Sequence, residues 1–367
     1  MKSIGTVARW ATALVTAGAL LAVSGGIAQA DPVPVSGTEG LVKIGSSFLP
    51  PGTPLVSPDG RRAYTIANDT DNHTRVRVVN TVADRVVATI DLGMEKWTRY
   101  RPALSADGRR LYVLNGLTLS VIDTGRDRVL NSLDLPDEPR PTGWGPGVAG
   151  TIAVNGPLVY VTQDGPAPGT SVPTAGLVWV YDTARRAVTG SVQLPGGDPR
   201  SIAVRPDGRS AYVSTETGIV HLDTTGAVPT VLGTVPGTAN AQVDGLALTP
   251  DGSSLYAVNA VGDGTAIRVD LNHDTVTAHL TLTKGYSQLA SPLVSADGTR
   301  LFVANSYPSG APSVLAFDTA TGAEVPNEDV FGFDVDDLVG LAIGPDGQTM
   351  YGTGGDSNGA ELQIFDF

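Results

Sequence analysis

The sequence predicts an all-β fold made of seven copies of one four-stranded unit, and three observations support this prediction. First, glycine recurs at intervals of 44 to 52 residues, at Gly60, Gly108, Gly156, Gly208, Gly252, Gly298 and Gly347. Second, each of these glycines is followed four residues later by an aromatic residue. Third, no stretch shows convincing helical periodicity. Four short β-runs in about 45 residues are typical of one propeller blade, so we predict a seven-bladed β-propeller.

The first thirty residues have the features of a secretory signal sequence. Lys2 and Arg9 provide positive charge, residues 11–23 form a short apolar run, and Ala28-Gln29-Ala30 has the small-x-small pattern of a cleavage site. The alternative is an uncleaved anchor helix, for which the apolar run is short. The expected organisation is a signal peptide over residues 1–30, a short linker over 31–40 and a single propeller domain over 41–367.

Composition limits the environment and the partners of the chain. The full sequence has a net charge of −13 and contains no cysteine, which excludes disulfides and cysteine-ligated metals. Removing residues 1–30 leaves 22 basic and 37 acidic residues, a net charge of −15. An acidic surface of this kind repels nucleic acid and anionic lipid. We therefore expect a secreted or cell-envelope monomer with no nucleic-acid partner and no membrane span after signal cleavage.

Each repeat contains the signals for four antiparallel strands. A short apolar run such as residues 201–204 forms the first strand, and an Asp-Gly pair then makes a tight turn because glycine accepts a positive φ. The aromatic residue starts the second strand, as at residues 112–114. A third run ends in Asp-Thr, as at Asp182-Thr183, and a fourth run such as residues 187–192 completes the unit. Asn155-Gly156 is a degenerate copy of the Asp-Gly turn.

These motifs resemble the YVTN β-propeller repeat, which is known from bacterial surface-layer and other secreted proteins. Tyr112-Val113-Leu114-Asn115 is the nearest match to the name-giving tetrapeptide, and residues 256–259 and 302–305 are variants of it. The resemblance covers residues 41–367. It implies a seven-bladed ring but leaves the function open, because such propellers have many roles. The WD40 repeat fits less well, since no repeat contains Trp-Asp or Gly-His.

The seventh repeat is incomplete, because the chain reaches Phe367 after the third strand of that repeat. A missing fourth strand would leave an open sheet edge. Residues 41–48, just before the first repeat, form an orphan strand. We predict that this strand pairs with residues 361–367 and closes the ring.

Function is expected on one face of the disc. The Asp-Gly and Asp-Thr turns lie on the first face, here called the turn face. The loops between second and third strands and the connections between blades lie on the opposite face, here called the loop face. The segments of the loop face are longer and less regular, and long loops on a rigid scaffold often carry function. The candidate ligand-binding residues on the loop face are Trp97, Arg99, Arg101, Trp144, Asp244, Tyr286 and Phe333.

Two interpretations of these candidate residues are open. In the first, Trp97 and Trp144 stack on a ligand while Arg99 or Arg101 binds its anionic group. The ligand would then be an unidentified protein, glycan or small molecule. In the second, the aromatic side chains plug the ring and the charged side chains pair with one another.

No cofactor is expected, although two acidic segments deserve comparison with calcium sites. Asp334, Asp336 and Asp337 cluster carboxylates of the kind that calcium prefers. They lack the complete calcium-loop pattern with its distal glutamate, and residues 68–72 fail the same comparison. A solvated acidic loop is the alternative for both segments.

No catalytic residue is predicted. The four histidines, His73, His221, His273 and His279, lie outside the expected inner strands. Inner strands such as residues 152–154 and 246–248 present apolar and small residues without an acid–base pair. The leading hypothesis is therefore a non-catalytic scaffold that binds a ligand or a protein. The alternatives are a propeller hydrolase or lyase acting on a lactone-like or cyclic ester substrate, and a structural surface-layer component.

Overall fold

The computed structural model describes most of the chain after residue 39. The described residues are 40–47, 49–96, 101–136, 142, 144–145, 147–165, 167–168, 175–239, 243–259, 261–306, 313–325, 337–356 and 358–366. All of them belong to the second of the two units into which the chain divides, residues 31–367. No helix in the described part of the chain is long and apolar enough to cross a membrane.

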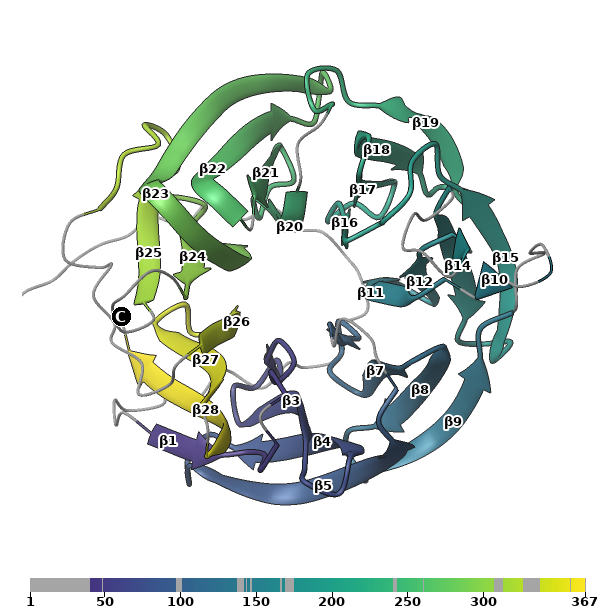
Figure 1. Cartoon of the computed structure of the whole chain (residues 1–367), viewed down its shortest axis with the longest axis vertical. Coiled ribbons are helices and arrows are strands. Elements are labelled where there is room, and N and C mark those ends of the chain that lie inside the picture. The colour runs from purple at the N-terminus through teal and green to yellow at the C-terminus, as the bar shows by residue number, and fades with distance from the viewer. Residues whose placement is uncertain are drawn as a thin grey trace, which may run out of the picture. The chain divides into compact units, whose positions relative to one another are not determined.

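Seven antiparallel blades surround one axis, which confirms the predicted all-β propeller (Figure 1). Blade 1 consists of β2 (Leu55–Val56), β3 (Arg62–Asn68), β4 (His73–Asn80) and β5 (Arg85–Met94). Blade 2 consists of β6 (Ala103–Leu104), β7 (Arg110–Asn115), β8 (Thr118–Asp123) and β9 (Arg128–Asp134). Blade 3 consists of β11 (Ala149–Asn155), β12 (Leu158–Gln163), β14 (Leu177–Asp182) and β15 (Ala187–Gln193). Blade 4 consists of β16 (Ser201–Val204), β17 (Ser210–Thr215), β18 (Gly218–Asp223) and β19 (Thr230–Thr234).

Blades 5 and 6 share one long strand, which the sequence did not indicate. Blade 5 begins with β20 (Val243–Leu248), β21 (Ser254–Asn259) and β22 (Val261–Asp270). Its fourth strand, the first part of β23 (Thr275–Val294), continues without a break into the first strand of blade 6. Blade 6 then adds β24 (Arg300–Asn305) and β25 (Ser313–Asp318), and Glu324 bridges to Phe317 on the outer side. Residues 261–263 pair with residues 286–288, so the expected loops here form a strand extension.

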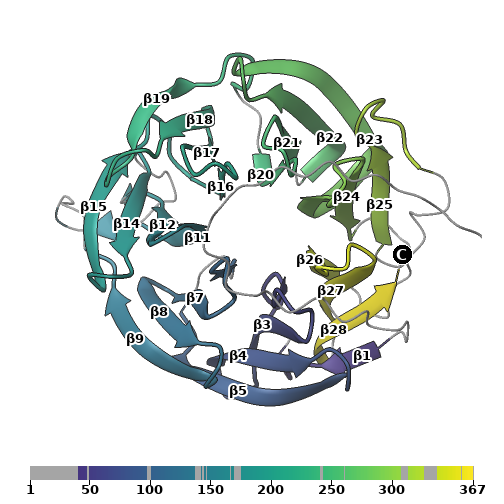
Figure 2. The same ribbon diagram turned by 180° about the vertical axis from the view of Figure 1, so that it is seen from behind.

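The N-terminal strand completes blade 7 and confirms the predicted closure. Blade 7 consists of β26 (Asp337–Ile343), β27 (Thr349–Asp356), β28 (Gly359–Asp366) and β1 (Gly40–Lys43). Strand β1 pairs with β28 from Gly40 opposite Ile364 to Lys43 opposite Glu361. Both views show β1 at the outer edge of blade 7, next to blade 1 (Figures 1 and 2). The paired run is thus shorter than the predicted 41–48 and starts one residue earlier.

Residues 40–47, here called the closing segment, are also fixed to blade 1. The side chain of Ile44 is buried against both blades 7 and 1. The backbone N–H of Ser46 donates to Oδ1 of Asp69 at 3.1 Å, and Arg75 forms an ion pair with the same carboxylate at 2.8 Å. Arg77 pairs with Asp69 as well and donates from Nε to the carbonyl of Ile44 at 2.6 Å. The closing segment therefore holds blades 7 and 1 together.

The repeated aromatic residue packs between neighbouring blades. Its side chain is at most 2% exposed in all seven blades. Each one lies in a hydrophobic cluster that joins its own blade to the next, such as Tyr112 between blades 2 and 3 and Tyr351 between blades 7 and 1. A large buried side chain at this position of every repeat explains why the spacing is kept.

The glycine of each repeat has the positive φ expected of the turn. The seven φ values lie between 56° and 75°. In blade 1 the hydroxyl of Thr81 donates to the carbonyl of Gly60 at 2.6 Å, and Thr124 makes the same contact with Gly108 in blade 2. These hydrogen bonds join the two turns of one blade, which explains why Asp-Gly and Asp-Thr recur together on the turn face.

The aspartate of the Asp-Gly turn is a hydrogen-bond acceptor. Oδ1 of Asp297 accepts from the hydroxyl of Ser295 at 2.5 Å and from the backbone N–H of Thr299 at 3.0 Å. Asp251 accepts in the same way from Thr249 and Ser253. These hydrogen bonds lower the pKa of Asp297 and of Asp251 to about 2.

We expect the protein to lose stability in acid through these turns. A carboxylate whose pKa is lower in the folded state stabilises the fold above its unfolded pKa of 3.8, and this contribution disappears as the pH falls toward about 2. The urea midpoint should therefore be constant above about pH 5 and fall between about pH 4 and 2. The double variant Asp251→Asn, Asp297→Asn should show a shallower fall. Equal pH profiles for the variant and the parent protein would contradict this role.

Candidate functional site

The described structure places only part of the predicted loop-face site. Trp97, Arg99 and Phe333 lie outside the described residues. Asp244 falls in β20 at a β-bulge, and Tyr286 falls in β23 opposite Asp263, so Tyr286 lies on the strand extension and not on an irregular loop.

Arg101 and Trp144 are both half-buried and contact different segments. Arg101 forms a parallel bridge with Thr151 of β11, and its Nη1 lies 3.5 Å from the carbonyl oxygen of Arg200. Arg101 therefore connects the first strands of blades 2 and 3 to the start of blade 4. Trp144 lies in the short strand β10 (Trp144–Gly145), which pairs with β13 (Ala167–Pro168). The role of both residues in ligand binding stays a prediction.

The weak calcium candidates are only partly described. Asp334 and Asp336 lie outside the described residues, and Asp337 is an exposed residue at the start of β26. Within the described ranges, no three histidine, cysteine or acidic side chains gather in a way that could hold a metal ion. In residues 68–72, Asp69 and Asp71 both pair with Arg75.

The junction of blades 4 and 5 contains a serine–histidine–aspartate chain that sequence analysis missed. Nε2 of His221 lies 3.0 Å from Oγ of Ser210, and its Nδ1 lies 2.7 Å from Oδ2 of Asp274. The hydroxyl of Tyr212 donates to Oδ1 of Asp274 at 3.0 Å, and its ring stacks on His221 with centroids 4.5 Å apart. The order of the atoms is that of a nucleophile, a base and an orienting acid. No sequence signal marks it, because Asp274 lies 53 residues after His221.

A second site arises on the turn face where two turns depart from the repeat. In blade 3, six residues separate Ala153 from its paired Tyr160, whereas eight separate Ala103 from Tyr112 in blade 2. The shorter connection is the degenerate Asn155-Gly156 turn, so the sequence contained a signal for it. A short turn leaves space beside the next blade.

The neighbouring turn of blade 4 is longer than its counterparts. Six residues, 224–229, connect the paired residues Asp223 and Thr230, whereas four residues connect Asp123 to Arg128 in blade 2. Val228 of this loop lies over β15, so close that a side chain at Gly190 would clash with it. The longer loop thus forms a wall opposite blade 3.

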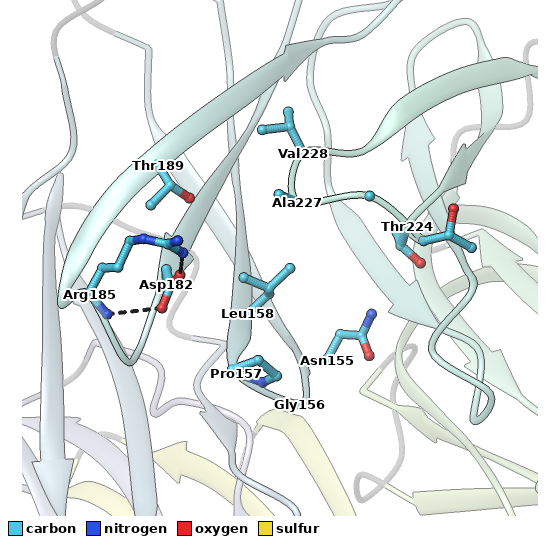
Figure 3. A pocket seen from close by; sticks show the side chains of 12 residues that line it. Asn155, Gly156, Pro157, Leu158, Asp182, Arg185, Thr189, Thr224, Ala227 and Val228 are labelled. Atoms are coloured by element: carbon cyan, nitrogen blue, oxygen red, sulfur yellow. Dashed lines mark hydrogen bonds and ion pairs between the residues drawn. The ribbon is translucent and has the colours of Figure 1, made fainter.

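The short turn and the long loop enclose a hollow of about 760 Å³, here called the blade 3–4 hollow (Figure 3). Asn155, Gly156 and Pro157 come from the short turn, and Thr224, Ala227 and Val228 come from the long loop. Figure 3 shows Asp182 and Arg185 on the blade 3 side, with Leu158 between the two walls.

The lining of the blade 3–4 hollow combines polar and apolar groups. Asp182 accepts from the backbone N–H groups of Ala184 and Arg185 and pairs with the Arg185 guanidinium, and these contacts lower the pKa of Asp182. The carboxylate is therefore ionised at neutral pH, while the Arg185 side chain is 72% exposed. The Asp182 carboxylate is only 7% exposed and orients the guanidinium, which offers donors, while Leu158 offers an apolar contact. Such a lining suits a small polar ligand with an aliphatic part.

Comparison with known proteins supports the fold. No protein-family model matches the sequence, and comparison with curated proteins gives no match. Among solved structures, a chain of hydrazine synthase from Kuenenia stuttgartiensis is similar, with a TM-score of 0.61 and 17% sequence identity. The similarity covers 88% of this chain and 97% of that chain. At this identity the likeness shows the β-propeller fold alone.

Proposed function

We propose that this protein is an exported, non-catalytic β-propeller of the YVTN type that binds a small polar ligand or a short peptide in the blade 3–4 hollow. The supporting observation is that both walls of the hollow depart from the repeat, one by a deletion and the other by an insertion. Changes of turn length in a repeat protein are common at binding surfaces. The predicted loop-face residues, including Arg101 and Trp144, form a second surface for a protein, glycan or small-molecule partner in this proposal.

Filling the hollow is expected to abolish ligand binding. Ala227 lines the hollow and is exposed, so Ala227→Trp should occupy the space without disturbing the core. Saturation-transfer NMR with amino acids, di- and tripeptides and simple sugars should identify compounds that bind the parent protein, and Ala227→Trp should lose them. Ala83→Trp places the same side chain at an exposed position of the blade 1 turn and should keep them. Compounds that bind all three proteins equally would place the binding site elsewhere.

Export is proposed from the N-terminal pattern of residues 1–30. Expression of the complete gene in a bacterium with a general secretion pathway should give a protein outside the cytoplasm whose N-terminus is Asp31. Full-length protein held in the membrane fraction would support an uncleaved anchor instead. Recovery from the cell-wall fraction would favour the surface-layer alternative.

Ester or lactone hydrolysis is the second candidate function, and the Ser210–His221–Asp274 chain is the observation that favours it. A hydrolase also needs space for a substrate and donors for an oxyanion. Ser210, His221 and Asp274 do not line the blade 3–4 hollow. We expect a fluorophosphonate probe to leave the protein unlabelled. Labelling that disappears in Ser210→Ala, together with turnover in a lactone and ester screen, would establish hydrolysis and replace the scaffold proposal.

A further inference from the structure

At two of the junctions between blades, an aspartate with positive φ joins a blade to the one before it. At the junction of blades 1 and 2, Asp127 has a φ of 49° and accepts from Nη1 of Arg62, the first residue of β3, at 2.8 Å. At the junction of blades 4 and 5, Asp274 also has a φ of 49° and accepts from Tyr212 and His221. The aspartate therefore receives hydrogen bonds from the second and third strands of the preceding blade.

The junction of blades 2 and 3 has an arginine in place of this aspartate. The residue equivalent to Arg62 is Arg110, the first residue of β7, and the residue equivalent to Asp127 is Arg186, with a φ of 54°. Positive φ favours aspartate and asparagine over arginine. Arg186 therefore adopts an unfavourable backbone conformation. It also leaves Arg110 without a carboxylate equivalent to that of Asp127, and Nη1 of Arg110 donates instead to the carbonyl of Arg109 at 2.8 Å. Backbone strain of this kind is often found at functional sites.

The two arginines lie on one cavity of about 150 Å³ between the blades. Tyr112, Tyr181 and Asn131 line it as well, and both tyrosines are 2% exposed. Burial, with a smaller contribution from Tyr181, raises the pKa of Tyr112 to about 12, so the hydroxyl of Tyr112 keeps its proton. The lining of this cavity lies entirely within described residues and includes no acidic side chain. Hydrogen-bond donors thus converge on a small space.

Two carboxylates outside the cavity lining, those of Asp107 and Asp123, interact electrostatically with Arg110, and both already have other hydrogen-bond partners. Asp123, opposite Arg110 on β8, pairs with Arg126 at 3.0 Å and accepts from the backbone of Gly125. Asp107 accepts from Ser105 at 2.6 Å and from the backbone N–H of Arg109 at 3.0 Å. No side-chain hydrogen bond or ion pair of Arg186 is found among the described residues. The cavity has an excess of positive charge in a protein of net charge −13.

We propose that this cavity binds a small tetrahedral oxyanion, phosphate or sulfate, which takes the place of the missing aspartate carboxylate. Guanidinium groups bind such oxyanions with paired hydrogen bonds, and tyrosine hydroxyls and an amide can donate to the remaining oxygens. The cavity is smaller than the roughly 300–1,000 Å³ typical of sites for drug-sized ligands. It holds either a free ion or the terminal group of a larger molecule.

The test compares phosphate, sulfate and glycerol 3-phosphate with sodium chloride at equal ionic strength. Calorimetric titration should show one site per chain, and saturating phosphate or sulfate should raise the melting temperature by about 2–4 °C. Binding of glycerol 3-phosphate as tightly as phosphate would indicate a terminal group of a larger ligand. Binding of the inorganic ions alone would indicate a free ion. Either result supports the site. Failure of phosphate, sulfate and glycerol 3-phosphate alike to bind would overturn it.

Arg186→Asp introduces the residue found at the blade 1–2 and blade 4–5 junctions and is the decisive variant. It should weaken phosphate binding by at least about tenfold, as expected for the loss of a charge-assisted hydrogen bond. Without added anion it should melt about 2–4 °C higher than the parent protein, because aspartate suits the positive φ and pairs with Arg110. Arg209→Asp makes the same charge change at an exposed position on blade 4 and should keep phosphate binding.

Undiminished phosphate binding by Arg186→Asp, or equal losses in Arg186→Asp and Arg209→Asp, would contradict the proposal. If Arg186→Asp does not fold, Arg110→Gln provides the same test from the other side of the cavity. Arg110→Gln should likewise lose the response to phosphate and keep its response to sodium chloride.

Discussion

Deleting the closing segment is expected to abolish cooperative folding. The deletion removes β1, which pairs with the outer edge of β28, and exposes the apolar surface that Val42 and Ile44 cover in blades 7 and 1. Burial of each of these two side chains contributes about 1.5–3 kcal/mol, and the ion pairs and hydrogen bonds of Asp69 add to this. The total is a large part of the about 5–15 kcal/mol by which a folded protein is stable. We therefore expect a protein without residues 40–47 to be largely insoluble, or to show no sharp thermal transition by calorimetry.

Point variants distinguish the loss of side-chain packing from the removal of the backbone of residues 40–47. Val42 is 4% exposed and Leu41 is 47% exposed on the same strand. Val42→Asp should therefore lower the melting temperature strongly, whereas Leu41→Asp should change it little. A synthetic peptide of residues 40–47 should raise the melting temperature of any soluble truncated protein. A truncated protein with the melting temperature of the parent would show that the ring does not depend on this closure.

The blades could be predicted because their signals are local. A glycine that needs positive φ, and an aromatic residue four positions later, report turn geometry and a buried inter-blade position within a few residues. The closure could be predicted for a similar reason, since a repeat that lacks a strand and an orphan strand at the other end of the chain leave one pairing. Only the pairing register and the length of β1 could not be inferred from the sequence.

The joining of blades 5 and 6 could not be predicted. Strand β23 stays extended across the connection because residues 261–263 of β22 pair with residues 286–288. Pairing between two connections depends on where the rest of blade 5 places them. The sequence of either connection, taken alone, resembles an ordinary loop.

The residues of the candidate sites differ in how far they could be predicted. Contacts of Ser210, His221 and Asp274 depend on the packing of blade 4 against blade 5, so no spacing rule reveals them. Arg186, in contrast, could have been found by aligning the Asp-Thr turns, since Asp127 and Asp274 occupy its position elsewhere. Departures from a repeat are therefore as informative as the repeat itself.

Replacing Asp274 by asparagine is expected to lower the free energy of unfolding by about 2–3 kcal/mol, because hydrogen bonds to a charged group contribute about 1.5–3 kcal/mol. Both oxygens of Asp274 accept, one from the hydroxyl of Tyr212 and one from the ring of His221. Burial and the charge of Asp274 raise the pKa of Tyr212, so its hydroxyl keeps its proton and needs an acceptor. Asparagine offers one acceptor oxygen, and its amide group would face the second donor. Urea unfolding followed by tryptophan fluorescence measures the difference.

Asp84→Asn is the matched control, since it makes the same chemical change at the equivalent turn position. Asp84 has a φ of 44°, and asparagine tolerates positive φ as well as aspartate does, so neither variant adds backbone strain. Burial raises the pKa of Asp84, which means that its ionised carboxylate slightly destabilises the folded state. Asp84→Asn should therefore keep or slightly increase the free energy of unfolding. A loss in Asp274→Asn no larger than that in Asp84→Asn would mean that the Tyr212–His221–Asp274 contacts do not hold blades 4 and 5 together. A loss specific to Asp274→Asn would show that the blade 4–5 junction depends on the hydrogen bonds that its positive-φ residue accepts. The same reasoning underlies the anion that we propose beside Arg186.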